Sequence, residues 1–329
     1  MTTILVTGGA GFIGSCFVRH MLNKYSDYKI INLDALTYCG NLENLTDIEK
    51  NPNYSFVHGN ICDKNLVYEL IKDVDCVVNF AAESHVDNSI LHPEIFVQTN
   101  VQGTLNLLQA SKELGIERFL QVSTDEVYGA LGKTGYFYES TPLAPNSPYS
   151  ASKAGSDMLV RAYNKTYNLP TLNTRCSNNY GPYQYPEKLI PFFISKLLKN
   201  EKVPIYGNGL NVRDWLYVYD HCRAIDAVLH KGKIGEIYNI GGHNEKTNLE
   251  ITRLILKSMG KDESFIQYVP DRLGHDKRYA ISNDKITTEL GWEPSITFEE
   301  GIQLTIQWYL NNQNWIKSIE TKRAILNEV

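Results

Sequence analysis

The stretch Thr7-Gly8-Gly9-Ala10-Gly11-Phe12-Ile13-Gly14 spaces three of its glycines as GxxGxxG near the start of the chain. It follows a short β-branched run, Thr3–Thr7, that predicts a strand, and it opens a helical pattern over Phe12–Asn23. Glycine permits the tight turn and lets the backbone approach a pyrophosphate, whose charge is favoured by the free N–H groups at the helix start. This context predicts a dinucleotide site rather than an ordinary turn between a strand and a helix.

An acidic residue follows at the distance that this interpretation requires. Asp34 comes directly after the second expected strand, Lys29–Leu33, about 20 residues beyond the glycine loop. Its carboxylate can accept hydrogen bonds from a ribose diol and would repel a 2′-phosphate. We therefore expect NAD rather than NADP as the cofactor. The alternative is that Asp34 only caps its own loop.

Strands and helices alternate through the first half of the chain. Further strands are expected at Tyr54–His58, Cys76–Phe80, Arg118–Ser123 and Thr171–Arg175, and helices at Lys64–Ile71, Glu94–Leu114 and Tyr149–Tyr167. This alternation predicts an α/β fold, a Rossmann-type, doubly wound parallel sheet covered by helices on both faces. We place this NAD-binding domain at residues 1–175.

The local amino-acid composition changes from residue 176 onward. Asn, Gly, Pro and Tyr become frequent in the stretch from Ser177 to Pro186. Helices are expected at Leu189–Lys199, Tyr219–His230, Asn248–Met259 and Glu299–Asn311, and the last dozen residues, from about Lys317, are expected to fray. We interpret residues 176–329 as a smaller α+β domain that mainly binds substrate, with segments that return to the Rossmann sheet.

Composition and charge argue against several classes of protein. The 32 Lys and Arg residues against 37 Asp and Glu give a net charge of −5, which argues against nucleic acid as a partner. The apolar runs are too short to span a bilayer and the first residues lack a signal-peptide pattern, so we expect no membrane partner and a cytoplasmic location. The six cysteines show no CxxC pair and no zinc spacing, so we expect reduced thiols and no metal.

Tyr149 and Lys153 are candidates for acid–base chemistry. They stand four residues apart at the start of an expected helix, so they lie on one face of it. A tyrosine ionises near pH 10, but a cation about 4 Å away at an effective dielectric near 20 contributes about 4 kcal/mol. Lys153 is therefore expected to make Tyr149 a usable base, helped by an oxidised nicotinamide. The alternative is a solvated helix face, since this spacing often arises by chance.

A hydroxyl and two carboxyl groups follow the fifth expected strand, in Thr124-Asp125-Glu126. The carboxyl ends of strands are where ligands bind in open α/β sheets. Thr124 can hydrogen-bond a substrate oxygen beside Tyr149. Asp125 and Glu126 both reach a substrate only if the strand ends here, and different surroundings could then keep one as an acid and the other as a base. The alternative is a solvated acidic loop.

Together these residues resemble the extended short-chain dehydrogenase/reductase family along most of the chain. Further segments are similar to its nucleotide-sugar 4,6-dehydratases, namely residues 36–41, 81–87, 176–183, 186–191 and 271–276. The resemblance implies an enzyme that holds NAD tightly and takes a nucleoside-diphosphate hexose as substrate. It would oxidise C4, eliminate water across C5 and C6, and reduce C6. The overall resemblance, and no base-contacting residue, favours a thymidine nucleotide.

The resemblance also implies roles for individual residues. Tyr149, assisted by Thr124 and Lys153, would take the proton of the 4-hydroxyl, Glu126 would be the base at C5, and Asp125 would protonate the leaving C6 oxygen. The implied cofactor contacts are Gly8, Gly11, Phe12, Ile13, Gly14, Asp34, Asn60, Ile61, Ala81, Thr99, Tyr149, Lys153 and Asn179. The implied substrate contacts are Ser84, Thr124, Asn178, Lys188, Leu189, Arg213, Asn248, Arg272 and His275.

Two positions depart from the family pattern. Asn60 stands where an aspartate usually touches adenine, and its amide oxygen can still accept a hydrogen bond from the adenine amino group. Leu273 stands where proline is common, which loosens the loop around Arg272. Arg213 and Arg272 suit a diphosphate because guanidinium groups match phosphate oxygens.

Two other functions compete with this interpretation. A nucleotide-sugar 4-epimerase or decarboxylase would share the glycine loop and the Tyr149/Lys153 chemistry, but would not need Asp125 and Glu126 for elimination. A non-enzymatic NAD-binding regulator on the same fold is predicted to lack Tyr149 or Lys153, and both are present. A homodimer is also expected, because members of the family pair through the two helices expected at Glu94–Leu114 and Tyr149–Tyr167.

Overall fold

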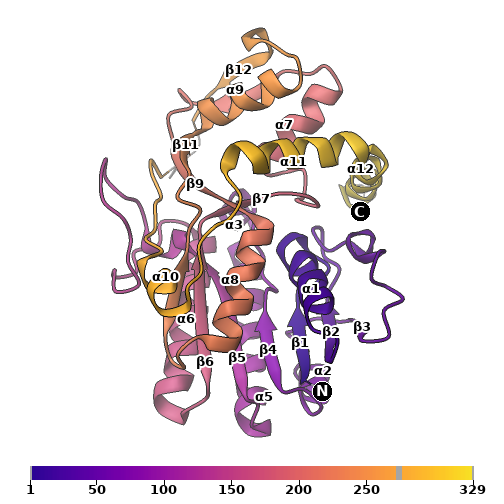
Figure 1. Ribbon diagram of the computed structural model, residues 1–329, viewed down its shortest axis with the longest axis vertical. Coiled ribbons are helices and arrows are strands. Elements are labelled where there is room, and N and C mark those ends of the chain that lie inside the picture. Colours follow the sequence, from indigo (N-terminus) through magenta and orange to yellow (C-terminus); the bar gives the residue numbers. More distant parts are fainter. Residues whose placement is uncertain (1, 272–275, 328–329) are drawn as a thin grey trace.

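The computed structural model describes residues 2–271 and 276–327, with side chains through residue 322. Its centre is a seven-stranded sheet in which all neighbouring strands are parallel (Figure 1). The strand order is β10 (Ile237–Ile240), β6 (Thr171–Cys176), β5 (Arg118–Thr124), β4 (Cys76–Asn79), β1 (Thr2–Thr7), β2 (Tyr28–Asp34) and β3 (Tyr54–His58). This confirms the predicted doubly wound parallel sheet.

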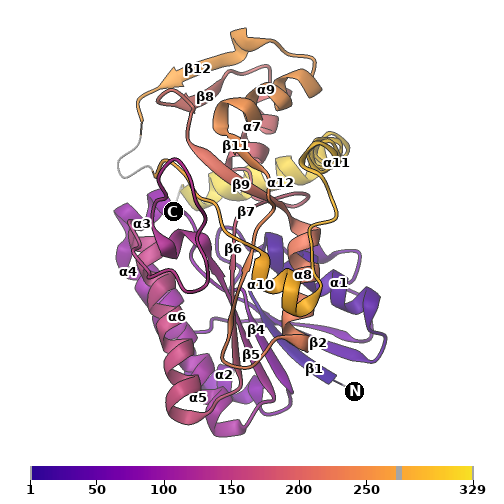
Figure 2. The ribbon, with the colours of Figure 1, turned by 60° about the vertical axis from the view of Figure 1, so that its left-hand side comes forward.

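Helices cover both faces of this sheet (Figure 2). One face carries α1 (Phe12–Lys24) and α8 (Val218–Lys231), and the other carries α2 (Lys64–Ile71), α5 (Thr104–Leu114) and α6 (Pro148–Tyr167). Successive side chains of a strand point to opposite faces. Accordingly, Ile4 and Val6 of β1 pack in the core under α1 and α8, whereas Leu5 packs in the core under α2, α5 and α6. Burial on both faces explains why these strands read as continuous apolar runs.

The remaining elements form a second layer at the carboxyl edge of the sheet (Figure 1). They comprise α7 (Leu189–Leu198), α9 (Asn248–Ser258), α11 (Phe298–Asn311), α12 (Gln313–Asn327), a sheet of β7 (Asn178–Tyr180), β9 (Val212–Tyr217) and β11 (Glu245–Thr247), and a pair of β8 (Val203–Tyr206) and β12 (Ile266–Val269). Smaller pieces elsewhere in the chain are η1 (Leu42–Leu45), α3 (Val86–Leu91), η3 (Asp125–Tyr128), η4 (Glu263–Phe265) and α10 (Asp284–Leu290). Of these, η1 packs against α1, and α10 packs against α8 and β10 of the main sheet. The hydrophobic core of the second layer contains Tyr180, Trp215, Phe298 and Tyr309, and all four are buried.

Two local predictions differ from the structure. The helix expected over Glu94–Leu114 is α4 (Pro93–Phe96), a π-helical segment η2 (Val97–Gly103) and α5 in succession. A π segment shifts the faces of a helix, and such segments are frequent at functional sites. The end of the chain does not fray from Lys317, because α12 continues to Asn327 and buries Ile316 and Ile319 against the second layer. An apolar stripe on this helix outweighs the general tendency of chain ends to loosen.

Candidate active site

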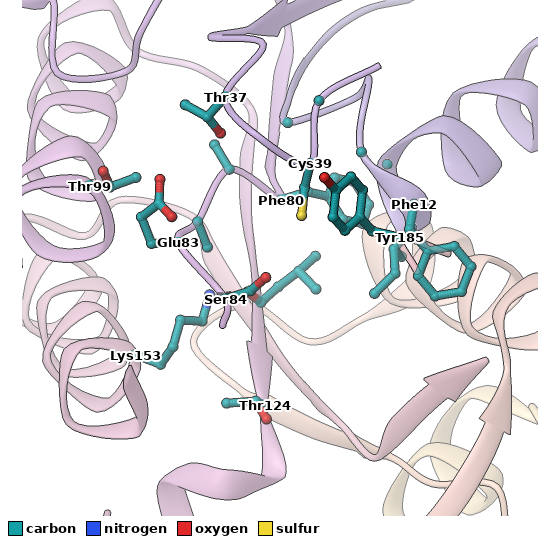
Figure 3. Close-up of a pocket in the computed structure, with 18 of the residues that line it drawn as sticks. Phe12, Thr37, Cys39, Phe80, Glu83, Ser84, Thr99, Thr124, Lys153 and Tyr185 are labelled. Carbon is teal, nitrogen blue, oxygen red and sulfur yellow. Dashed lines mark hydrogen bonds between the residues drawn. The ribbon is translucent and has the colours of Figure 1, made fainter. Parts of the chain in front are cut away.

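A cavity of about 460 Å³ lies where the strands of the main sheet end. Residues that follow β1, β2, β3, β4, β5 and β6 all line it, so it sits at the carboxyl edge where ligands of open α/β sheets bind. Figure 3 shows Thr99, Glu83 and Lys153 on one side of this space, and Phe12, Cys39 and Tyr185 on the other. The second layer supplies Tyr185 and its neighbours, so both halves of the chain build the cavity.

The glycine loop forms one end of the cavity. Gly8 has a φ of +72°, and its carbonyl oxygen accepts a hydrogen bond from the Gly11 nitrogen at 3.2 Å. A Cβ on Gly14 would overlap the Gly8 carbonyl oxygen, so the helix can start this close to β1 only without a side chain there. No side chain caps the nitrogen end of α1 and its first turn holds no acid. The free N–H groups therefore remain for a phosphate, as the sequence predicted.

Asp34 lies at the end of β2 with its carboxylate in the cavity wall. Its two oxygens accept hydrogen bonds from the backbone nitrogens of Ala10, at 2.9 Å, and Leu36, at 2.8 Å. Burial raises the pKa of Asp34, and these two N–H donors oppose the rise. The carboxylate keeps further lone pairs for a diol, while also tying the glycine loop to β2. Asp34 is therefore both a loop cap and a candidate ribose contact.

Asn60 lies on the same side of the cavity. Its side-chain oxygen accepts a hydrogen bond from the Cys62 backbone nitrogen at 2.8 Å. The oxygen was expected to face an adenine amino group, and one of its two lone pairs is already engaged within the loop. The second lone pair remains for that contact.

The acid pair enters the cavity because β5 ends at Thr124. The 3₁₀ turn η3 begins at Asp125, and both Asp125 and Glu126 line the cavity. Asp125 is 2% exposed, and within residues 2–271 and 276–327 its Oδ2 atom has no hydrogen-bond partner. Burial, then the neighbouring Glu126, raises the pKa of Asp125 well above its ordinary value. The strand thus ends where the sequence analysis required it to end if both carboxyl groups are to reach one space.

Tyr149 and Lys153 lie on α6, which begins with a capping box at Ser147 and a proline at its first position. The Lys153 ammonium donates a hydrogen bond to the Val122 carbonyl oxygen at 2.8 Å. Burial raises the pKa of Tyr149 well above its ordinary value, Glu126 adds to the rise, and a hydrogen bond with Thr124 opposes it. Burial also lowers the pKa of Lys153.

Burial outweighs the neighbouring groups and raises the pKa of Tyr149, so the expected help from Lys153 and an oxidised nicotinamide stays a prediction. The lysine is held by a strand carbonyl, and the cost of burying a phenolate outweighs the neighbouring groups. The Thr124 hydroxyl does lie beside Tyr149, as the sequence predicted.

All the residues expected to contact the cofactor line this single cavity. They are Gly8, Gly11, Phe12, Ile13, Gly14, Asp34, Asn60, Ile61, Ala81, Thr99, Tyr149, Lys153 and Asn179. Four residues expected to contact the substrate also line it, namely Ser84, Thr124, Asn178 and Lys188.

Three expected substrate contacts lie elsewhere. Leu189 opens α7 next to Lys188 and packs against the second-layer core. Arg213 is buried in β9, donates hydrogen bonds to the carbonyl oxygens of Val212 and Asp276, and stacks on Tyr279. Asn248 begins α9 and is partly buried. Each belongs to the second layer rather than to the cavity wall, and Arg272 and His275 fall outside the described residues.

A cluster around Glu187 was not assigned from the sequence. The Tyr38 hydroxyl donates a hydrogen bond to Glu187 at 3.2 Å, and the His85 imidazole lies 3.8 Å from its other oxygen. The Lys188 ammonium donates to the Ser84 carbonyl oxygen at 3.0 Å. These contacts join three loops at the mouth of the cavity. Their segments are among those that carry the family resemblance, and this was the available signal.

The cavity wall fits a dinucleotide and a hexose. Four buried polar atoms of its lining residues have no hydrogen-bond partner among the described residues, namely the hydroxyl oxygens of Ser123 and Ser177, Oδ2 of Asp125 and Oε1 of Gln184. Buried polar groups are normally hydrogen-bonded, so unmet groups in a cavity indicate a polar ligand. Together with the uncapped start of α1, they provide for both a phosphate and sugar hydroxyls.

Comparison with known proteins assigns the chain to a family. The model of the GDP-mannose 4,6 dehydratase family matches residues 5–305. The chain belongs to this family. Its sequence is 55% identical to the dTDP-glucose 4,6-dehydratase of Xanthomonas campestris pv. campestris (strain B100), over 97% of this chain and 96% of that protein.

Solved structures of this dehydratase family and its neighbours share the fold. The crystal structure of dTDP-glucose 4,6-dehydratase from Bacillus anthracis str. Ames in complex with NAD is 57% identical, with a TM-score of 0.92, and the match covers 97% of this chain and 100% of that one. UDP-glucose 4-epimerase from Thermotoga maritima is 32% identical, with a TM-score of 0.88 and coverages of 95% and 100%. The dehydratases are thus nearer in sequence than this epimerase. Among the described residues, every helix is too short or too polar to cross a membrane.

Proposed function

We propose that this chain is an NAD-dependent dTDP-glucose 4,6-dehydratase, a hydro-lyase that forms dTDP-4-keto-6-deoxyglucose. One observation carries the proposal beyond the shared fold. Asp125 and Glu126 both face the cavity that holds Tyr149, Thr124 and the glycine loop. A 4-epimerase needs the tyrosine and the cofactor but has no use for two carboxyl groups in an elimination.

The first step requires a base at the 4-hydroxyl of the sugar. Tyr149 takes this proton, and the Thr124 hydroxyl beside it holds the same oxygen by a hydrogen bond. NAD supplies the hydride acceptor and donor that links C4 to C6. Lys153, with its ammonium fixed near the end of β5, provides a cation in the wall of the site. A positive charge close to the phenol lowers the free energy of deprotonating Tyr149, whereas burial raises it.

The second step removes water across C5 and C6. The new 4-keto group makes the C5 proton acidic, because the carbanion is stabilised as an enolate. Glu126 removes this proton, and Asp125 protonates the C6 oxygen as it leaves. The raised pKa of Asp125 suits this role, since burial keeps the carboxyl group protonated at a pH where an exposed one would be ionised.

The residues around the sugar and nucleotide are assigned by position. Ser84, Asn178 and Lys188 contact the substrate from the cavity wall. Residues 1–175 bind NAD and residues 176–329 mainly bind substrate. Arg213 and the arginine at position 272 are the candidate diphosphate contacts, and Arg213 reaches that role only if its bonds to backbone carbonyls rearrange.

Assembly and location extend the proposal. The helices expected to pair two copies expose apolar side chains, among them Ile95, Val97, Met158 and Tyr167. Such exposure on neighbouring helices supports a homodimer. Sedimentation at micromolar concentration should give twice the mass of one chain, and a monomer alone would refute the dimer. The six free cysteines support a reducing compartment, the cytoplasm.

One experiment tests reaction and nucleobase together. The protein is incubated separately with dTDP-, UDP-, GDP- and CDP-glucose, and the products are analysed by mass spectrometry. We expect the dTDP sugar alone to give a product lighter by one water. A product of unchanged mass with inverted C4 would establish an epimerase instead. No change with any of the four sugars would overturn the proposal.

A further inference from the structure

His221 lies behind the cavity, outside the set of residues that line it. It belongs to the first turn of α8, is fully buried, and contacts Asn179 of β7. Its Nδ1 atom is 2.9 Å from the side-chain oxygen of Asn179. Asn179 itself lines the cavity and is one of the candidate cofactor contacts. His221 is therefore one residue removed from the dinucleotide.

The hydrogen bonds fix which nitrogen of His221 carries the proton. The Asn179 side-chain nitrogen donates to the Ser177 carbonyl oxygen at 3.0 Å, so the amide oxygen must face the imidazole. An amide oxygen only accepts, hence Nδ1 donates to it. Burial lowers the pKa of His221 to about 3, so the ring is neutral and Nε2 carries a lone pair.

That Nε2 atom has no hydrogen-bond partner in the part of the chain that the structure describes. Burying a polar atom without a partner costs free energy, and a leucine could occupy part of the same space without that cost. The only side-chain hydrogen bond of the ring among the described residues is the one to Asn179. The benefit of a histidine here is thus the orientation of the Asn179 amide.

The backbone around Asn179 is held independently of His221. The Gln184 side-chain nitrogen donates to the Asn179 carbonyl oxygen at 2.9 Å. Gln184 is in turn held by the hydroxyl of Tyr309, on α11, at 2.6 Å. These contacts locate the main chain, whereas among the described residues Ser177, His221 and the Cys176 thiol contact the amide group. One of its two hydrogens goes to Ser177, and the other faces the Cys176 sulfur in the cavity wall, a weak acceptor that a ligand oxygen can replace.

We propose that His221 is a positioning residue for NAD, which acts by fixing the side-chain amide of Asn179 toward the cavity. The proposal rests on the proposed function in that Asn179 contacts the cofactor. Without the Nδ1–H donor, the Asn179 amide can rotate so that its oxygen and nitrogen change places. Its N–H group then points away from the ligand for part of the time. The effect falls on cofactor affinity rather than on the acids that remove water.

Two nearly isosteric substitutions separate the donor from the packing. H221N keeps an N–H donor at the place of Nδ1, and H221L fills the same volume without a donor. The bound cofactor is removed from each purified protein, and the dissociation constant of NAD is measured by calorimetry. We expect a loss of about tenfold in H221L and a change within about threefold in H221N, the range of one neutral hydrogen bond. The melting temperatures of the cofactor-free proteins serve as the structural readout and should not follow this order.

A third variant covers the case in which H221L does not fold. H221Q is polar and places its donor where Nε2 stands, so it should bind NAD as weakly as H221L is expected to. Parental affinity in H221L or H221Q overturns the role of His221 while leaving the proposed function intact, and so does an H221N variant as weak as either. If the parent chain itself does not bind NAD, the proposed function fails, and the role of His221 falls with it.

Discussion

At the dinucleotide end of the cavity, both oxygens of Asp34 accept hydrogen bonds from backbone nitrogens, whereas at the reacting end Oδ2 of Asp125 accepts none. The first end is built mainly from main chain, with Gly8 and Gly14 shaping a turn. The second is built from side chains whose pKa values are strongly shifted, Asp125 and Tyr149 among them. The contrast teaches that binding can be supplied by groups satisfied within the protein, while chemistry requires groups left for the substrate to satisfy.

The largest effect is expected from removing the charges of the acid pair. The double variant D125N/E126Q loses both proton transfers of the elimination, each worth about 10²–10⁴ in rate, so dehydration should fall at least about 10³-fold. NAD binding and oxidation at C4 should survive, because neither acid belongs to the dinucleotide end. Mass spectrometry reports the loss of water, and absorbance near the NADH maximum reports trapped reduced cofactor.

A matched control exists for this variant. Asp262 and Glu263 are also adjacent acids, but they lie on the surface at η4. D262N/E263Q should dehydrate the substrate at the parental rate. If D125N/E126Q does the same, the roles given to the acid pair are wrong.

The glycine loop should respond in affinity rather than in chemistry. In G14A, the new Cβ overlaps the Gly8 carbonyl oxygen and forces the turn apart. Overpacking of this kind costs about 1–3 kcal/mol, so NAD should bind about 10- to 100-fold more weakly by titration of the cofactor-free protein. G155A on α6 is the control, because its Cβ would meet only a methyl group of Val101, at 3.3 Å, and its affinity should stay within about twofold. Equal affinities of the two variants would contradict the geometry of the loop.

Asp125 should lower stability at the pH where it supports activity. The pKa of Asp125 in the folded protein is raised above the ordinary value of 3.8. Its favourable contribution to the free energy of unfolding is therefore present below pH 3.8, and it is lost as the pH rises toward the pKa of the folded protein. D125N, which cannot ionise, should therefore melt about 2–4 °C higher than the parent at pH 8, with the difference closing near pH 4. Scanning calorimetry at the two pH values measures this. A D125N variant that melts below the parent at pH 8 would show that burial of the charge is not costly.

The smallest effect is expected at Asn60. An aspartate in its place can accept the same hydrogen bond from the Cys62 nitrogen and keeps a lone pair for adenine. N60D should change the dissociation constant of NAD by less than about threefold, since the two side chains differ only in the adenine contact. A tenfold change would mean that this position discriminates between family members after all.

The parts of the fold and site that the sequence predicted are those encoded over short distances. The glycine loop, Asp34 at the end of β2, and the acids after β5 follow from local patterns, and the structure places all of them in one cavity. Contacts between distant segments could not be predicted in this way. Tyr38 and Glu187 meet across 149 positions of the chain, and no local pattern encodes that meeting.

Similar reasons explain where the structure differs from the arrangement expected from the sequence. Arg213 carries a charge suited to phosphate, but backbone carbonyls and the Tyr279 ring hold it within the second layer. No residue pattern over Val97–Gly103 marks the change to π-type hydrogen bonding, so the sequence predicts one continuous helix. The pKa of Tyr149 depends on burial, which is a property of the assembled site and not of the four-residue spacing to Lys153.

The position of β10 has a consequence for how such a chain can be divided. This strand comes from the second half of the sequence, yet it pairs with β6 and closes that edge of the main sheet. A fragment ending at Arg175 would lack it and would present β6 as a bare hydrogen-bonding edge, prone to stick to other chains. The two halves are therefore poor units for exchange between genes. In a chimera, the foreign sugar-binding half must itself supply the strand that pairs with β6.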